Sequence, residues 1–113
     1  MPANHAKTHR ATARFRIDKF AAPTPAVDEF VAQMKHLQTT LQAQPGCTHA
    51  AVLTDLGGPG RFNVLTWVEW QDQASVDAAA AVMQKQFASS GFDPKAFMQR
   101  LGVDGDLGVY AAV

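Results

Sequence analysis

Two side chains on one predicted strand suit an aromatic ligand. Asn63 and Trp67 are four positions apart in residues 62–70, a segment rich in residues that favour strands. Because side chains alternate along a strand, we expect both on the same face. The asparagine amide can donate to a phenolate oxygen, while the tryptophan can stack on a flat ring and offer its indole N–H. The structural alternative is that Asn63 simply begins the strand and Trp67 simply fills the core.

Two histidines are candidates for a general base. His36 lies in a predicted helix, on the flank of its apolar stripe, and His49 lies in a predicted strand beside Cys47. Each can exchange a proton near neutral pH, although a purely structural role is the alternative for both. Cys47 and His49 are only two ligands, so we expect no metal site. As the single cysteine, Cys47 excludes an internal disulfide and favours a reducing, cytoplasmic setting.

The composition argues against nucleic-acid and membrane partners. Ten basic residues balance ten acidic ones, so no overall field attracts an anionic polymer or membrane surface. The sequence has no run of about 20 apolar residues that could span a bilayer. Because 47% of the 113 residues are hydrophobic, we expect one globular domain over residues 13–113, preceded by a frayed tail over residues 1–12.

The hydrophobic pattern predicts the element order βαββαβ. Strands are expected at 13–20, 47–56, 62–70 and 107–113, with main helices after Thr24 as N-cap and after Asp72, and a short helix after Asp93. We therefore predict an α+β, ferredoxin-like fold with a four-stranded antiparallel sheet and both main helices on one face. The other face is expected to pair with a second copy, giving a homodimer. We expect Arg14, Arg16 and Asp18 on that interface, with Arg16 at a pocket mouth as the alternative.

Several short motifs, in order and spacing, resemble one protein family. They are Phe15-Arg16-Ile17, Pro45-Gly46, Gly60-Arg61-Phe62, Glu69-Trp70 and Ser75-Val76. The chain resembles the antibiotic biosynthesis monooxygenase domain family, whose members are dimeric α/β barrels. The resemblance implies a pocket between the helices and the sheet of each subunit. It also implies one of several activities, because some members oxidise polycyclic phenols without metal or flavin and others degrade haem.

The resemblance gives the candidate residues specific roles. Quinone-forming members have an asparagine and a tryptophan close together on this strand, which Asn63 and Trp67 match; Phe15 is assigned with them to substrate binding, and His36 or His49 as the base. Haem degradation is disfavoured, since residues 75–87 contain no histidine and residues 13–20 no asparagine. The expected function is cofactor-independent oxidation of an aromatic or phenolic molecule. The alternative is a non-catalytic protein that binds a small apolar ligand or has a stress-related role, so the enzyme assignment stays open.

Overall fold

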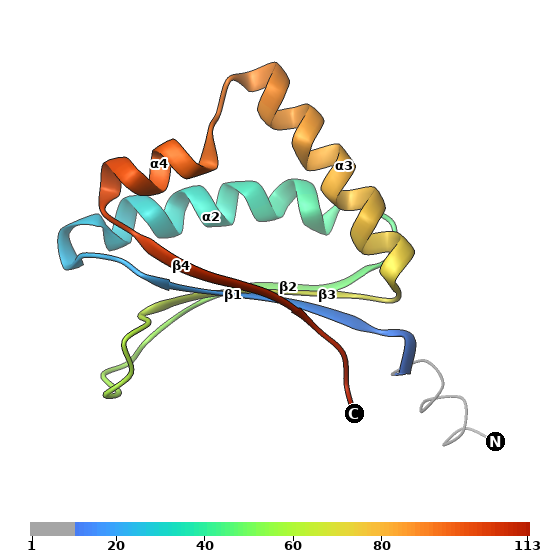
Figure 1. The fold of residues 1–113 in the computed structure, drawn as a ribbon, viewed down its shortest axis with the longest axis horizontal. Helices are drawn as coiled ribbons and strands as arrows, with labels where there is room; N and C mark the ends of the chain where they lie inside the picture. Colours follow the sequence, from blue (N-terminus) through green and yellow to red (C-terminus); the bar gives the residue numbers. More distant parts are fainter. Residues whose placement is uncertain (1–10) are drawn as a thin grey trace.

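The computed structural model describes residues 11–113, so most of the tail predicted for residues 1–12 lies outside the described residues. In chain order the elements are β1 (Arg14–Ala21), the 3-10 turn η1 (Thr24–Ala26), α2 (Val27–Gln42), β2 (Cys47–Thr54), β3 (Val64–Trp70), α3 (Gln73–Ser90), α4 (Pro94–Leu101) and β4 (Asp104–Tyr110). All three α-helices lie on the same side of the sheet (Figure 1).

The four strands form one antiparallel sheet in the order β2-β3-β1-β4. The two central strands are β1 and β3, and in their register Ile17 lies opposite Trp67. On its other side β1 pairs with β4, where Ile17 lies opposite Gly108. This topology confirms the predicted α+β, ferredoxin-like fold with its four-stranded antiparallel sheet.

Two aspartates begin the helices that follow β3. The Asp72 carboxylate accepts hydrogen bonds from the backbone N–H of Ser75 at 2.9 Å and from its hydroxyl at 2.7 Å. These two bonds hold the pKa of Asp72 below its usual value, and the bond from the hydroxyl has the larger effect. Asp93 accepts from the backbone N–H of Lys95 at 3.0 Å and of Ala96 at 3.2 Å, which starts α4. Both caps agree with the sequence prediction.

Several boundaries differ from the prediction; for example, β2 ends at Thr54 rather than at residue 56, and β3 begins at Val64 rather than at residue 62. Thr24 was expected to cap the first helix, but it lies inside η1, and no side chain caps α2. The last strand begins at Asp104 rather than at residue 107. Gly105, which precedes the strand predicted at 107–113, is paired with Phe20 in the sheet. A Cβ at Gly105 would lie 2.9 Å from the Met98 side chain, so glycine permits β4 to pass closely beneath α4.

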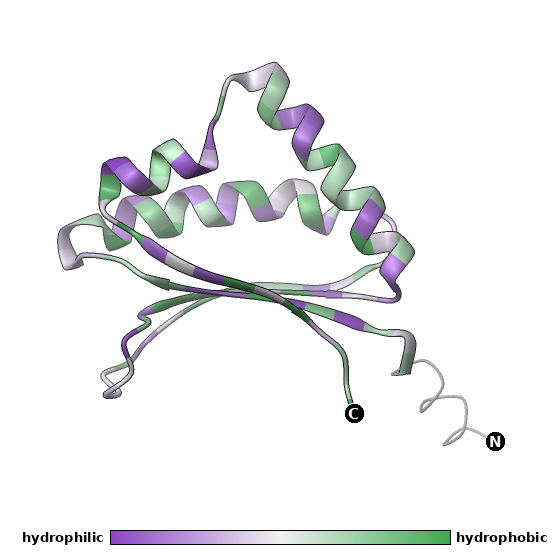
Figure 2. Ribbon diagram, in the orientation of Figure 1, coloured by the Kyte–Doolittle hydropathy of each residue, from purple (hydrophilic) through white to green (hydrophobic). Residues whose placement is uncertain are grey.

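The sheet has two different faces. On the helix side, β3 buries Val64, Thr66, Val68 and Trp70, and Phe30 of α2 is fully buried. Hydrophobic and hydrophilic residues alternate along α2, as expected for a helix with one buried stripe (Figure 2). The other side, which we call the open face, has no helix over it (Figure 1). By strand register the open face carries the apolar side chains of Phe15, Ile17, Leu53, Leu65, Trp67 and Tyr110.

The predicted position of the β1 charges was wrong. Arg14, Arg16 and Asp18 were expected on the open face, but Arg16 and Asp18 line a cavity on the helix side, and Arg14 lies on the same side of β1. Arg16 and Asp18 are four and two residues from Phe20, so all three side chains lie on the same face of β1. Phe20 is 4% exposed and packs against Phe30 with ring centroids 4.8 Å apart. Because side chains alternate along a strand, burying Phe20 turns Asp18 and Arg16 toward the helices as well.

Asn63 joins three segments of the chain just before β3. Its side-chain oxygen accepts from the backbone N–H of Ala22 at 2.8 Å, and its amide nitrogen donates to the Ala22 carbonyl at 2.8 Å. Its backbone N–H donates to the carbonyl of Phe20 at 2.9 Å, and its carbonyl accepts from the N–H of Asp55 at 2.9 Å. The Asn63 side chain therefore closes the end of β1 against the hairpin.

The substitution Asn63→Ala is expected to destabilise the fold, because it leaves both backbone groups of the buried Ala22 without partners. The expected loss is about 1–3 kcal/mol in the free energy of unfolding, measured by urea denaturation. The control is Gln42→Ala, which truncates an exposed polar side chain of α2. Equal urea midpoints for the two variants would contradict this role.

Candidate functional site

A cavity of about 440 Å³ lies between the sheet and the three helices. Its volume is within the range of about 300–1,000 Å³ that is common for small-molecule sites. Much of the lining is aromatic or thioether in character: Phe20, Trp70, Phe87, Phe97, Met34, Met83 and Met98. Such a lining suits a flat apolar ligand, because aromatic rings stack and methionine side chains adapt to irregular shapes.

One ion pair lies at the sheet side of this cavity. The Arg16 Nε–H donates to Asp18 Oδ1 at 2.7 Å, and the backbone N–H of Gly108 in β4 donates to the same oxygen at 3.3 Å. The side chain of Asp18 is 14% exposed and that of Arg16 is 41% exposed. The two terminal guanidinium nitrogens of Arg16 make no hydrogen bond with any residue in the range 11–113. They are therefore available to a ligand.

The other polar side chains that line the cavity are neutral. Gln38 is 5% exposed and donates to the Ala51 carbonyl at 2.8 Å, which fixes its amide against β2. Thr66 and Gln84 complete the polar lining. Asp18 is thus the one carboxylate among the lining residues, and Arg16 the one cation.

Three of the predicted site residues lie together, but on the open face. The ring of Trp67 is in edge contact with Phe15, at 6.5 Å between centroids, and with His49, at 6.0 Å. The indole N–H of Trp67 is buried and has no hydrogen-bond partner among the described residues. Trp70 is three residues further along β3 and therefore on the opposite face, where it lines the cavity. The sheet therefore separates Trp67 from the helix-side pocket in which it was expected.

The two remaining predicted residues lie elsewhere. His36 is exposed on α2, and neither it nor His49 lines the cavity. Asn63 precedes β3, and both ends of its amide are bound to Ala22. The five residues thus do not converge on one cavity, and their proposed roles in binding and catalysis stay predictions. Sequence reasoning missed Asp18 as a cavity residue and gave Arg16 at a pocket mouth only as the alternative, although both lie on the same side of β1 as Phe20, which was the signal that could have found them.

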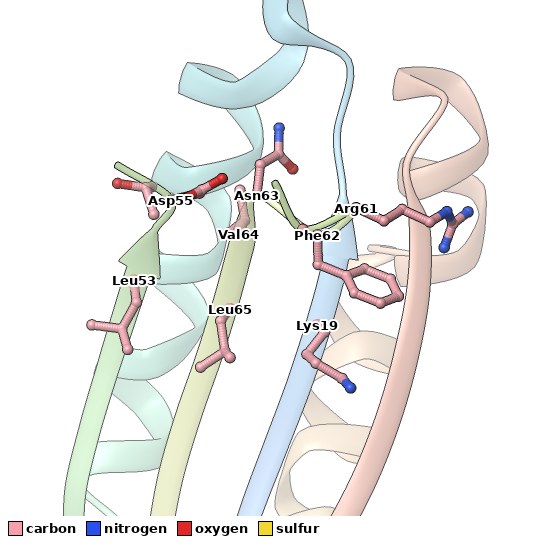
Figure 3. Close-up of a pocket in the computed structure, with 10 residues that line it drawn as sticks. Lys19, Leu53, Asp55, Arg61, Phe62, Asn63, Val64 and Leu65 are labelled. Carbon is pink, nitrogen blue, oxygen red and sulfur yellow. The ribbon is translucent and has the colours of Figure 1, made fainter. Parts of the chain in front are cut away.

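A second, shallower hollow lies at the end of the β2–β3 hairpin (Figure 3). Its volume is about 380 Å³, and the ring of Phe62 forms part of its wall. Lys19 Nζ lies 5.3 Å from the centre of that ring and the Arg61 guanidinium carbon 5.1 Å. Both cations are already paired, Arg61 with Asp104 at 3.0 Å and Lys19 with Asp106 at 3.5 Å. In this hollow, as in the helix-side cavity, each cation is therefore paired with an aspartate.

The described residues give no second type of site. Burial raises the pKa of the Cys47 thiol most, a hydrogen bond with the backbone of His49 partly opposes this rise, and the charge of Glu69 adds to it. The thiol form is therefore favoured at neutral pH, which makes Cys47 a poor nucleophile. Residues 11–113 contain no group of three or more side chains placed to hold a metal ion. Within the same range, no helix is both long and apolar enough to cross a bilayer.

Comparisons with solved structures show that the fold is shared. A conserved protein from Methanosarcina mazei Go1 is 20% identical with a TM-score of 0.70, covering 95% of this chain and 99% of that one. SnoaB, a cofactor-independent oxygenase from Streptomyces nogalater, is 18% identical with a TM-score of 0.64, covering 91% and 95%. The heme-degrader MhuD from Mycobacterium tuberculosis is 16% identical with a TM-score of 0.66, covering 88% and 95%. At these identities the likeness concerns the fold alone.

Sequence comparison is more specific about the family. Among curated proteins none matches the chain at a significant level. The family model described as antibiotic biosynthesis monooxygenase matches residues 8–81, which include β1 through β3 and the first part of α3. Two of the three cavity-lining strands and the whole of α2 lie within that match. The chain therefore belongs to the antibiotic biosynthesis monooxygenase family.

Proposed function

We propose that this protein is a cofactor-independent monooxygenase that oxidises an aromatic, phenolic small molecule in the cavity between its helices and sheet. The observation that carries the proposal is the lining of that cavity, which combines aromatic and methionine side chains with one ion pair. Family membership supports the reaction class, and a fold neighbour with the name of a cofactor-independent oxygenase agrees with it.

The reaction needs no reductant other than the substrate. A ring CH₂ group next to a phenol reacts with O₂ to give a ring C=O group and water, so both oxygen atoms are accounted for. The substrate carbon supplies all the electrons that reduce O₂. The protein's part is to bind the ring, to favour its ionised form and to admit oxygen to an apolar space. The cavity provides the apolar space, and Arg16 provides a cation beside it.

A non-catalytic ligand-binding protein is the second candidate. One observation favours it: neither His36 nor His49 lines the cavity, so the described residues supply no histidine base there. The same apolar lining would then bind a small aromatic molecule without converting it. The two candidates differ in oxygen consumption and not in binding. The cytoplasmic location expected from the sequence stays a prediction.

Filling the cavity is expected to abolish turnover in the first candidate. Ala80 is an exposed residue of α3 that lines the cavity, so Ala80→Trp places an indole at its wall. Offered a panel of anthrones and dihydroxynaphthalenes, metal-free and flavin-free protein should consume oxygen, and Ala80→Trp should lower kcat/KM by about tenfold or more. The control is Ala78→Trp, the same change at an exposed α3 position outside the lining.

The substitution Trp67→Ala tests whether the substrate binds in the helix-side cavity or at Trp67, which was expected from the sequence to bind it. Because Trp67 lies on the open face, turnover should survive its truncation in the same oxygen-uptake assay. Loss of turnover in Trp67→Ala, with Ala80→Trp unaffected, would move the site to the open face. No oxygen uptake with any compound of the panel would favour the binding protein instead.

We also propose that two copies pair through the open face. The face presents aromatic and aliphatic side chains on all four strands, with Leu53 46% and Tyr110 48% exposed in the single chain. Exposed apolar patches of several hundred Å² usually mark interfaces. The buried Trp67 N–H without a partner also favours pairing, because repacking against a second chain could bring an acceptor to it.

The double substitution Leu53→Glu with Tyr110→Glu is expected to turn the dimer into a monomer. Both side chains are about half exposed in the single chain, so the fold should tolerate the change while the interface would have to bury charges. Light scattering coupled to gel filtration measures the mass. Val82→Glu, which adds a charge at an exposed apolar position of α3, is the control and should stay dimeric. A wild-type protein of monomer mass would contradict the pairing.

A further inference from the structure

We propose that the ligand carries an anionic oxygen, a carboxylate or a phenolate, and that Arg16 is the residue that binds it. The inference rests on the proposed function only in using the same cavity. It assigns a chemical class to the ligand and a specificity-determining role to a residue of β1, neither of which follows from the family match.

Arg16 is held in place before any ligand arrives. Its Nε–H is bound to Asp18 Oδ1 at 2.7 Å, and Asp18 is fixed in turn by the N–H of Gly108 at 3.3 Å. The neighbouring strand therefore positions the carboxylate, and the carboxylate orients the guanidinium plane. A guanidinium that uses only its Nε–H in this way keeps two terminal nitrogens in fork geometry, which matches the two oxygens of a carboxylate or one phenolate oxygen.

The surroundings make this fork selective. The lining has no other cation, and its remaining polar groups, Gln38, Thr66 and Gln84, are neutral. The Asp18 carboxylate is compensated by two donors, so it opposes a bound anion less than an unpaired carboxylate would. Because the pair is neutral overall, the selectivity must come from short-range, charge-assisted hydrogen bonds and not from a long-range field.

A purely structural role explains the pair less well. Arg16 is 41% exposed, and ion pairs of such exposure contribute little to stability. The partial exposure is instead what a residue at the edge of an accessible cavity would show. Of the other paired arginines, Arg61 and Arg100 lie outside this cavity, which makes Arg61 a useful control.

The test compares matched anionic and neutral probes by isothermal titration calorimetry. The carboxylate pair is 2-naphthoate and 2-naphthalenemethanol, and the phenolate pair is 2,4-dinitro-1-naphtholate and its methyl ether. In wild-type protein at least one anion should bind about tenfold or more tightly than its neutral partner, which corresponds to about 1.4 kcal/mol. Whichever pair shows the preference identifies the carboxylate or the phenolate as the recognised group.

The variants decide whether Arg16 is responsible. Arg16→Gln keeps a donor toward Asp18 but removes the charge, so the preference should fall to near one while the neutral probes change less than twofold. Arg61→Gln should retain the wild-type preference. The proposal is overturned if neither anion is preferred by wild-type protein, or if Arg16→Gln weakens neutral and anionic probes alike.

Binding and turnover can fail separately. A charge preference that depends on Arg16, in a protein that consumes no oxygen, would uphold this assignment and overturn the monooxygenase proposal. Oxygen uptake that is unchanged in Arg16→Gln, together with equal binding of anionic and neutral probes, would overturn this assignment and leave the monooxygenase proposal standing.

Discussion

The contact between Phe20 and Phe30 decides what the rest of the sheet can do. Phe20 lies at the end of β1 and packs edge-on against a fully buried ring of α2, with centroids 4.8 Å apart. Since side chains alternate along a strand, this one contact turns Asp18 and Arg16 toward the helices. A shift of one residue in β1 would bring them to the open face and remove the ion pair from the cavity.

Much of the fold could be predicted from the sequence because its signals are local. The apolar spacing along α2, the caps at Asp72 and Asp93, and the glycine-rich connection of β2 and β3 at residues 57–60 all act within a few residues, and the structure agrees with each. The order of the strands followed from short connections. The start of β4 was missed because Gly105 is needed for close packing beneath Met98, a contact between segments that sequence spacing alone does not reveal.

The candidate site was harder to predict, because its residues are selected by long-range contacts. β1 has apolar residues of both parities, Phe15 and Ile17 on one side and Phe20 on the other, so its alternation alone could not say which set faces the helices. The amide of Asn63 looked suitable for a ligand, yet its partner is Ala22, far away in the sequence. Alternation along β3 predicts that its two tryptophans lie on opposite faces, but only the packing shows that Trp70 lines the cavity and Trp67 lies on the open face.

The sheet thus separates two aromatic surfaces, with one proposed for the ligand and the other for a second copy. The most direct test of this separation is fluorine NMR of protein labelled with 5-fluorotryptophan, since the chain has only two tryptophans and Trp67→Phe assigns the signals. Titration with 2-naphthoate should shift the Trp70 resonance to saturation and leave that of Trp67 nearly unchanged. A saturating shift of Trp67 with Trp70 unmoved would contradict a ligand site between the helices and the sheet.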